Sequence, residues 1–213
     1  MATYVVAITG ASGVIHAKRV LQEILGLSHA VKLIISPTGE QILELELGFK
    51  SNSELTSRQH QWREFIGCPD ESLELLDHGD LAAAIASGSF PVAGMVIIPC
   101  SMGTLGRIAT GISSNLIERT ADVVLKERRR LVLVPRESPV SLIHLRNMVT
   151  ITEAGGEIMP MTHFFYHHPM TIGDLVDAFV GRVLDRLGLP NRLAPRWQSG
   201  TSSVVGTREE GWK

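Results

Sequence analysis

The sequence predicts a single-domain α/β protein with a parallel, Rossmann-like or flavodoxin-like sheet between two layers of helices. Short apolar runs rich in β-branched residues recur at Tyr4–Thr9, Ala30–Ser36, Met95–Pro99 and Leu131–Pro135. Helix-like stretches separate these runs, and that alternation produces a parallel three-layer sandwich. The length of 213 residues suits one domain. We place this domain at residues 1–197 and a polar tail at residues 198–213.

Composition and charge exclude several classes of protein. The formal net charge of -2 gives no overall attraction to nucleic acid or to a membrane surface, so neither is predicted as a partner. The chain has no apolar run long enough to span a bilayer, and its first ten residues predict a strand rather than a signal peptide. Cys68 and Cys100 lack a metal-type spacing. We therefore expect a cytoplasmic protein without a disulfide scaffold.

The first strand is followed at once by a glycine turn and a helix. The sequence GASG occupies positions 10–13, and the helix is expected at about residues 14–27. In such a unit the glycines let the backbone approach an anion, and the free N–H groups of the helix start point at it. Taken alone, the motif predicts either a phosphate-binding turn or a tight turn with nothing bound.

The tip of the second strand argues against a nicotinamide cofactor. A nicotinamide-binding fold has an acidic residue there to hold the ribose hydroxyls, whereas this chain has Ser36 followed by proline and threonine. Hydroxyl groups at this position suit a flavin phosphate or ring edge. The next helix, expected at about residues 38–47, carries three glutamates that include Glu46. By residue type alone they indicate a solvated face.

The stretch from Phe49 to Glu74 is the least informative part of the chain. It is polar and predicts a linker or a surface helix. His60 and Trp62 stand singly in it and are assigned no functional role. The small-residue segment at 82–91 then leads into the strand at Met95.

A second strand-to-helix turn rich in small donors follows the strand that ends at Pro99. It reads CSMGT at positions 100–104. Two such turns at the carboxyl ends of parallel strands place their donors in one crevice, which is where open α/β sheets bind ligands. Cys100 is interpreted as a small buried residue rather than a nucleophile, because no base stands at a recognisable offset.

Charged residues dominate the next helix and the tip of the next strand. Residues three, four and seven positions apart share a helix face, and on this face they are Asn115, Arg119, Asp122 and Lys126. The basic residues there indicate either a solvated face with ion pairs or part of a site for a phosphorylated ligand. Arg136 and Glu137 directly follow a buried strand, and a charged pair at such a tip predicts a functional role.

The C-terminal part adds a fifth expected strand at Glu157–Pro160 and an amphipathic helix at Thr171–Leu187. Between them lies MTHFFYHHPM at 161–170, with three histidines. They have no acidic or cysteine partner at a standard zinc spacing, so no metal site is predicted. Tyr166 in this segment can donate a hydrogen bond to an anion.

Taken together, these pieces resemble the flavin prenyltransferases of the UbiX/Pad type over about residues 3–197. The resemblance is carried by TGASG at 9–13, ASGSFP at 86–91, PCSMGTL at 99–105, NLIER-x-ADV-x-LKERR at 115–129, LVLVPRE at 131–137, FYHHP at 165–169 and PRW at 195–197. The central block is highly specific in its combination of motifs.

The resemblance implies an activity, an assembly and a partner. Members of this family form large homo-oligomers, typically dodecamers, and bind reduced FMN with dimethylallyl phosphate or, in some members, the diphosphate. They join the prenyl group to N5 and C6 of the flavin without a metal. The product, prenylated FMN, serves UbiD-type decarboxylases.

The resemblance also assigns roles to individual residues, matched motif by motif. The FMN contacts would be Gly10, Ala11, Ser12, Ser36, Ser101, Met102, Gly103, Thr104 and Arg136. The prenyl donor would meet Arg119, Lys126, Arg136, Glu137, Tyr166, Arg182 and Trp197. Catalytic roles would fall to Ser12, Glu46, Lys126 and Glu137. For Glu46 this replaces the solvated-face interpretation, and the site would be shared between subunits.

Two segments near the expected prenyl pocket depart from the family pattern. His163 and Phe164 stand where the family commonly has a proline–glycine pair, and the helix start at 13–18, which contains His16, also differs. The choice between monophosphate and diphosphate donors therefore stays open.

Two alternative functions also stay open. The first is a flavin-dependent cysteine decarboxylase, which PCSMGT disfavours because that group has PASANT at this turn. The second is a non-catalytic FMN-binding subunit of an aromatic acid decarboxylase.

Overall fold

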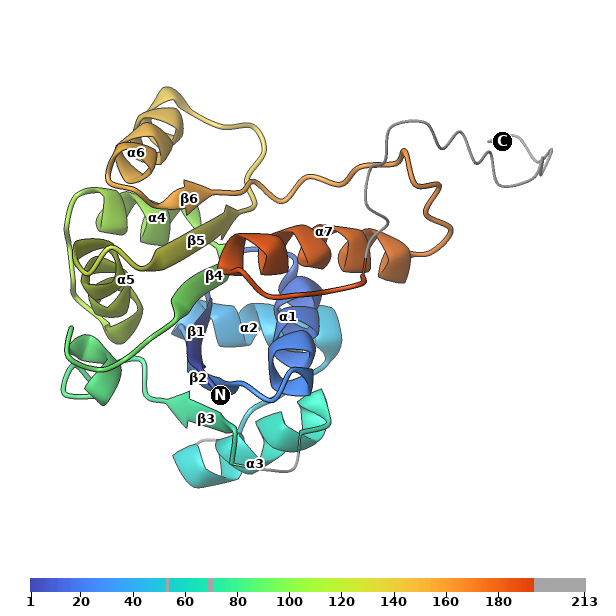
Figure 1. Cartoon of the computed structure of the whole chain (residues 1–213), viewed down its shortest axis with the longest axis horizontal. Coiled ribbons are helices and arrows are strands. Elements are labelled where there is room, and N and C mark those ends of the chain that lie inside the picture. Colours follow the sequence, from blue (N-terminus) through green and yellow to red (C-terminus); the bar gives the residue numbers. More distant parts are fainter. Residues whose placement is uncertain (53, 69–70, 194–213) are drawn as a thin grey trace.

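In the computed structural model, strands and helices alternate along the chain (Figure 1), and residues 1–52, 54–68 and 71–193 are described. The strands are β1 Thr3–Ile8, β2 Ala30–Ile35, β3 Leu73–Leu76, β4 Gly94–Cys100, β5 Arg130–Pro135 and β6 Glu157–Ile158. The helices are α1 Val14–Gly26, α2 Pro37–Leu47, α3 Leu55–Ile66, α4 Met102–Ala109, α5 Leu116–Lys126, α6 Leu142–Glu153 and α7 Ile172–Leu187, with a short 3-10 turn at Ala84–Ala86. Among these residues no helix is long and apolar enough to cross a membrane.

The strands form one parallel sheet in the order β3-β2-β1-β4-β5-β6. This is the strand order of the Rossmann fold, in which the chain winds outward in both directions from the centre of the sheet. Tyr4 of β1 pairs with Val31 on one side and Gly94 on the other. The topological switch point therefore lies between β1 and β4, and the two predicted donor turns follow the carboxyl ends of these strands.

Helices cover both faces of the sheet, which confirms the predicted three-layer sandwich (Figure 1). On one face the side chains of β1 at even positions pack against α1, α3 and α7, for example Val6, Leu21, Trp62 and Val180. On the other face the odd positions pack against α4, α5 and α6, for example Val5, Leu105, Val124 and Ile151. Both faces are apolar, as expected for a buried parallel sheet.

The stretch from Phe49 to Glu74 forms a helix, one of its two predicted alternatives, and packs on the core more closely than the sequence predicts. It contains α3, and Trp62 is fully buried, with its ring 4.7 Å from Phe49 and 5.6 Å from Phe65. The edge strand β3 was not predicted. Its four residues LELL are too short to display a clear period.

Residues 159–170, the segment between β6 and α7, extend away from the sheet as an arm (Figure 1). The arm begins against β5, where the N–H of Met161 donates to Pro135 O at 2.9 Å. It ends at the start of α7, where the Asp174 carboxylate accepts from the N–H groups of Met170 and Thr171. The arm is therefore fixed to the body at both ends.

Candidate functional site

Thr9 joins the ends of β1 and β4 at the switch point. Its hydroxyl donates to Pro99 O at 2.9 Å and accepts from the N–H of Ser101 at 2.7 Å. Thr9 is only 1% exposed. This one side chain holds the two donor turns together, as the sequence predicts for their crevice. No role was assigned to Thr9 from the sequence. A single hydroxyl residue between an apolar strand and a glycine turn could nevertheless have indicated a hydrogen bond to the neighbouring turn.

The turn after β4 forms the start of α4. Ser101 is the N-cap, and its Oγ accepts from the N–H of Thr104 at 3.3 Å and donates to Thr104 Oγ1 at 3.0 Å. The N–H groups of Met102 and Gly103 belong to the first turn of α4, where backbone donors have no partner within the helix. Such a helix start suits an anion.

At the turn after β1, a carboxylate of the same chain binds the backbone N–H groups at the start of α1. The Glu46 carboxylate accepts from the N–H of Gly13 at 2.9 and 3.1 Å and from that of Val14 at 3.1 Å. The N–H groups of Gly13 and Val14 therefore already have an acceptor within the chain. Glu46 reaches them from the end of α2, and no local pattern signals a contact across 32 residues. The contact brings Glu46 to the same edge as Ser12.

Ser36 caps α2 close to the same turn. Its Oγ accepts from the N–H of Gly39 at 3.0 Å and lies 3.2 Å from Thr38 Oγ1. A Cβ at Gly10 would lie 2.5 Å from Thr38 Oγ1, so only glycine lets the first turn lie this close to α2. Both caps use an acceptor lone pair of the serine hydroxyl, and the Ser101 hydroxyl proton is donated to Thr104 Oγ1.

The tip of β5 adds charge to the same edge of the sheet. Arg136 and Glu137 are exposed and directly follow the buried Pro135. Tyr166 is an exposed residue of the arm, and Arg182 lies on the exposed face of α7, where it pairs with Asp185 at 3.2 Å. Trp197 lies outside the described residues.

Lys126 lies at the opposite edge of the sheet. It is the last residue of α5, four positions before β5 begins, and it pairs with Glu127. A Cβ at Gly88, on the approach to β4, would lie 2.8 Å from Lys126 Nζ. Arg119, in the first turn of α5, donates to Ala86 O at 3.1 Å and pairs with Asp122 at 2.7 Å. Within one chain, the two basic residues of α5 do not meet the donor turns.

A buried carboxylate fixes the start of α5 against α4. Glu118, 1% exposed, accepts from the N–H and Oγ of Ser114 at 3.0 and 2.6 Å and pairs with Arg107. Burial by itself would raise the pKa of the Glu118 carboxyl, but the hydrogen bonds from Ser114 and Arg107 together lower it. The network is structural, since α4 and α5 depend on it for their placement.

Burial also settles the role of Cys100. It is fully buried at the end of β4, and burial raises the pKa of its thiol to about 12. A thiol with this pKa is a poor nucleophile at neutral pH. The interpretation of Cys100 as a small buried residue is confirmed.

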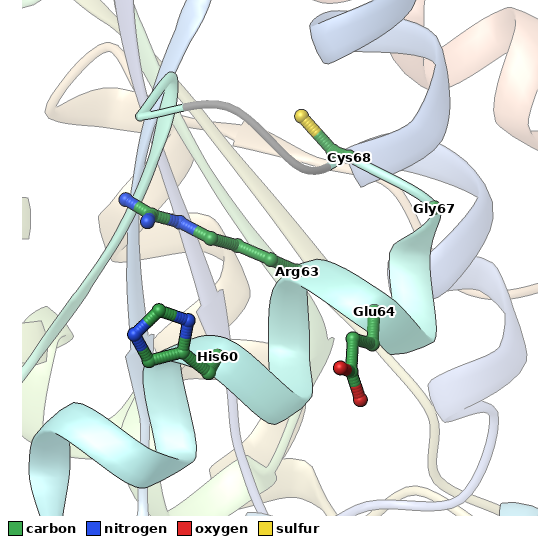
Figure 2. Close-up of a pocket in the computed structure, with 5 residues that line it drawn as sticks. All are labelled: His60, Arg63, Glu64, Gly67 and Cys68. Atoms are coloured by element: carbon green, nitrogen blue, oxygen red, sulfur yellow. The ribbon is translucent and has the colours of Figure 1, made fainter.

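A pocket of about 340 Å³ lies at the C-terminal end of α3, lined by His60, Arg63, Glu64, Gly67 and Cys68 (Figure 2). The Arg63 guanidinium extends toward β3 and donates to Leu73 O at 3.1 and 3.2 Å. Leu73 is the first residue of β3, so this pocket lies at the amino edge of the sheet. It is separate from the candidate site, and Arg63 has a structural role there.

The histidines of the arm do not converge on one site. The imidazole of His163 contacts that of His16, and His167 packs against Phe164 and Tyr166 with ring centroids 5.4 and 6.0 Å away. Among the residues that the structure describes, no group of three or more His, Cys, Asp or Glu is placed to hold a metal ion.

Comparison with known proteins identifies the family. The flavoprotein family model matches residues 2–184. The flavin prenyltransferase UbiX of Alkalihalophilus pseudofirmus is 47% identical over 192 residues, 90% of this chain and 94% of that protein. The chain therefore belongs to the flavin prenyltransferase UbiX family, which confirms the resemblance seen in the sequence.

Solved structures agree with this assignment. The crystal structure of AnUbiX (PadA1) in complex with FMN and dimethylallyl pyrophosphate matches with a TM-score of 0.83 and 40% identity, covering 92% of this chain and 97% of that one. A dodecameric FMN-dependent UbiX-like decarboxylase from Escherichia coli O157:H7 matches with a TM-score of 0.81 and 38% identity, covering 92% and 99%. The FMN-dependent cysteine decarboxylase TvaF, at 15% identity and a TM-score of 0.51, shares only the fold.

Proposed function

We propose that this protein is a flavin prenyltransferase that transfers a dimethylallyl group from dimethylallyl phosphate, or the diphosphate, to N5 and C6 of reduced FMN. The observation that carries the proposal is the pair of donor turns joined by Thr9 at the switch point, in a chain 40% identical to a UbiX protein crystallised with FMN and dimethylallyl pyrophosphate. Open α/β sheets bind their ligands at this point.

The donor turns fit FMN. The start of α4 offers the backbone donors of Met102 and Gly103 and the hydroxyl groups of Ser101 and Thr104. The first turn adds Gly10, Ala11 and Ser12, the tip of β2 adds Ser36, and the tip of β5 adds the cation Arg136. These small, hydroxyl-bearing residues allow a planar ring to approach the backbone, and Arg136 matches a phosphate. We assign FMN binding to this set.

The prenyl donor needs cations where its C–O bond breaks. Breaking this allylic bond puts negative charge on the departing phosphate, which Arg119, Lys126 and Arg182 would stabilise together with the Tyr166 hydroxyl. The flavin gives up its N5 and C6 protons as the new C–N and C–C bonds form, one of them passes to the released phosphate, and the other is taken up by the donor alkene. We assign phosphate positioning to Ser12, and proton transfer to Glu46 and Glu137.

The opposite positions of Lys126 and Arg136 lead us to propose a site shared between chains. Because Lys126 lies at the amino edge and Arg136 at the carboxyl edge, both can contact one donor only if they come from different copies. Large apolar side chains are exposed on α6 and the arm, among them Leu142 at 61%, Ile143 at 69%, Val149 at 55% and Met170 at 81%. A surface of this kind indicates an interface, and we propose a homo-oligomer, with the dodecamer as its expected form.

A mass measurement tests the activity. The protein is mixed anaerobically with reduced FMN and dimethylallyl phosphate, or with the diphosphate in a parallel reaction, and the flavin is analysed by mass spectrometry. A gain of one C5H8 unit supports prenyl transfer. Tight FMN binding with unchanged flavin mass in both reactions would instead favour the non-catalytic FMN-binding subunit.

The proposed reaction also sets the biological context. Prenylated FMN is a cofactor precursor, so we propose that the product is handed to a UbiD-type decarboxylase. We propose the cytoplasm as its location, since Cys68 and Cys100 form no disulfide.

A further inference from the structure

His16 and His163 contact each other across 147 residues of sequence. Their Nε2 atoms are 3.2 Å apart and their ring centroids 5.3 Å apart. His16 lies in the first turn of α1 and is 4% exposed, whereas His163 lies on the arm and is exposed. Neither residue is used in the reaction proposed above.

The hydrogen-bond partners fix the tautomers of both rings. His16 Nδ1 lies 3.0 Å from Gly13 O, and a carbonyl oxygen only accepts, so Nδ1 of His16 carries the proton. In the neutral ring, His16 Nε2 is then an acceptor, and the N–H at Nε2 of His163 donates to it. One added proton keeps the contact, because a neutral His163 can carry its proton on Nδ1 and accept at Nε2. Protonation of both rings puts two N–H groups face to face and breaks the contact.

The same side of the arm makes a second contact with the first turn of α1. A Cβ at Gly13 would lie 2.5 Å from the Met161 sulfur, so this thioether packs directly on the turn. Met161 and His163 are two residues apart and face the same way in an extended chain. Further along the arm, Phe164 and Tyr166 stack with ring centroids 5.1 Å apart and planes 12° apart.

The geometry points to a latch, in which His16 and His163 hold the arm on the first turn of α1, position Tyr166, and release the arm when both rings are protonated. The part of this inference that concerns Tyr166 rests on the proposed function. The turn that the latch grips is the one whose Gly13 N–H holds Glu46. The latch therefore places the arm, Glu46 and Ser12 in one unit, and His16 and His163 act as positioning residues.

The surroundings of His16 keep the latch closed near neutral pH. Burial lowers the pKa of the His16 imidazole, and the neighbouring His163 on the arm lowers it further, against the raising effects of the Gly13 carbonyl and of Glu46 from α2. The ring that packs against His16 from α7 is Phe179, which is uncharged. The ordinary value is 6.5, so His16 stays neutral at pH 7 and the latch opens only at lower pH, where both rings are protonated.

Hydrogen-exchange mass spectrometry on the assembled full-length protein tests the latch. At fixed pH 7.5, His163→Ala should speed exchange of the arm about three- to tenfold, as expected for the loss of one hydrogen bond. His163→Gln keeps a side-chain N–H donor and should restore the wild-type rate. His168→Asn is the matched control, because His168 is exposed on the same arm with φ 54°, which asparagine tolerates. Equal arm exchange in wild type and His163→Ala would overturn the latch.

Two further measurements separate the parts of the inference. After correction for the intrinsic pH dependence of exchange, the wild-type arm should approach the His163→Ala rate at low pH, and constant protection would refute the pH response. In kinetics, His163→Ala should raise KM for dimethylallyl phosphate about three- to tenfold with unchanged FMN affinity, and an unchanged KM would refute the positioning of Tyr166. If the wild type itself transfers no prenyl group, the proposed function fails, while the exchange result still decides the latch.

Discussion

Subunit mixing should reveal that one catalytic site takes Arg136 and Lys126 from different chains. β5 has six residues between the edges of the sheet where these two side chains lie, and at about 3.3 Å per residue it separates its ends by about 17 Å. Two cations that grip the same phosphate are within about 7 Å of each other, because each N–O distance is about 3 Å. Because the Lys126 ammonium is held at the amino edge by its pair with Glu127 and lies beside Gly88, the two cations of one chain do not come this close in the structure.

The perturbation is the pair of variants Lys126→Ala and Arg136→Ala, carried on chains with different affinity tags. Each variant alone should lose most of its prenyl transfer, since each homo-oligomer lacks one cation at every site. When the two are co-expressed and assemble at random, about a quarter of the sites receive both intact residues. The flavin-mass assay should then show about a quarter of the wild-type rate.

A second mixture gives a matched control. Wild-type chains co-expressed with the double variant carry the same total of altered residues, and a shared site again predicts about a quarter of full activity. If instead each chain supplied both residues to its own site, the first mixture would be inactive and the second about half active. That pair of results would refute the shared site.

Three further predictions follow from the packing of the chain. Cys100, whose burial raises its thiol pKa to about 12, should resist iodoacetamide at pH 8 in the native protein while the partly exposed Cys68 reacts, and peptide mass spectrometry reads both; alkylation of Cys100 ahead of Cys68 would contradict the structure. Glu118→Gln should lower the free energy of unfolding by about 2 kcal/mol. Because the pKa of the Glu118 carboxyl is lowered from 4.5 in the folded state, the stability advantage of the wild type in urea unfolding should hold above pH 4.5 and shrink as the pH falls through the lowered value. A stability advantage that does not change with pH would count against the network. Gly13→Ala should cost about 2 kcal/mol in thermal or urea unfolding, since Gly13 has φ 108° and the new Cβ meets Met161, whereas Gly26→Ala, with open space around its Cβ, is the control that should not destabilise.

The sheet was predictable because each of its central strands has a clear local sequence pattern. β1, β2, β4 and β5 are apolar runs bounded by turn residues, and the observed bounds differ from the predicted ones by one residue at each end or less. β3 escaped prediction because an edge strand of four residues carries too little pattern. The order of the strands, which places the switch point, depends on pairing between distant segments and no single segment shows it.

The sequence assigns site residues by type, whereas their arrangement depends on the fold. Ser101 and Ser36 were assigned to a flavin as hydroxyl donors, and the structure shows that both also cap helices. The Glu46 contact with Gly13 and the His16–His163 contact join residues far apart in sequence. Such contacts depend on the fold, so a pattern of neighbouring residue types cannot reveal them.

The most specific motif of the sequence, residues 99–137, shows why a recognisable block need not be one site. It contains the end of β4, helices α4 and α5, and all of β5, so the chain leaves β4 at the carboxyl edge, descends along α5 and comes back to that edge at Arg136. A crossover between parallel strands must cross to the amino edge on its way. Lys126, near the end of that crossover, is therefore carried away from Ser101 by the same topology that brings Arg136 back to it. If the whole motif serves one reaction, the chain must assemble so that the amino edge of one copy meets the carboxyl edge of another.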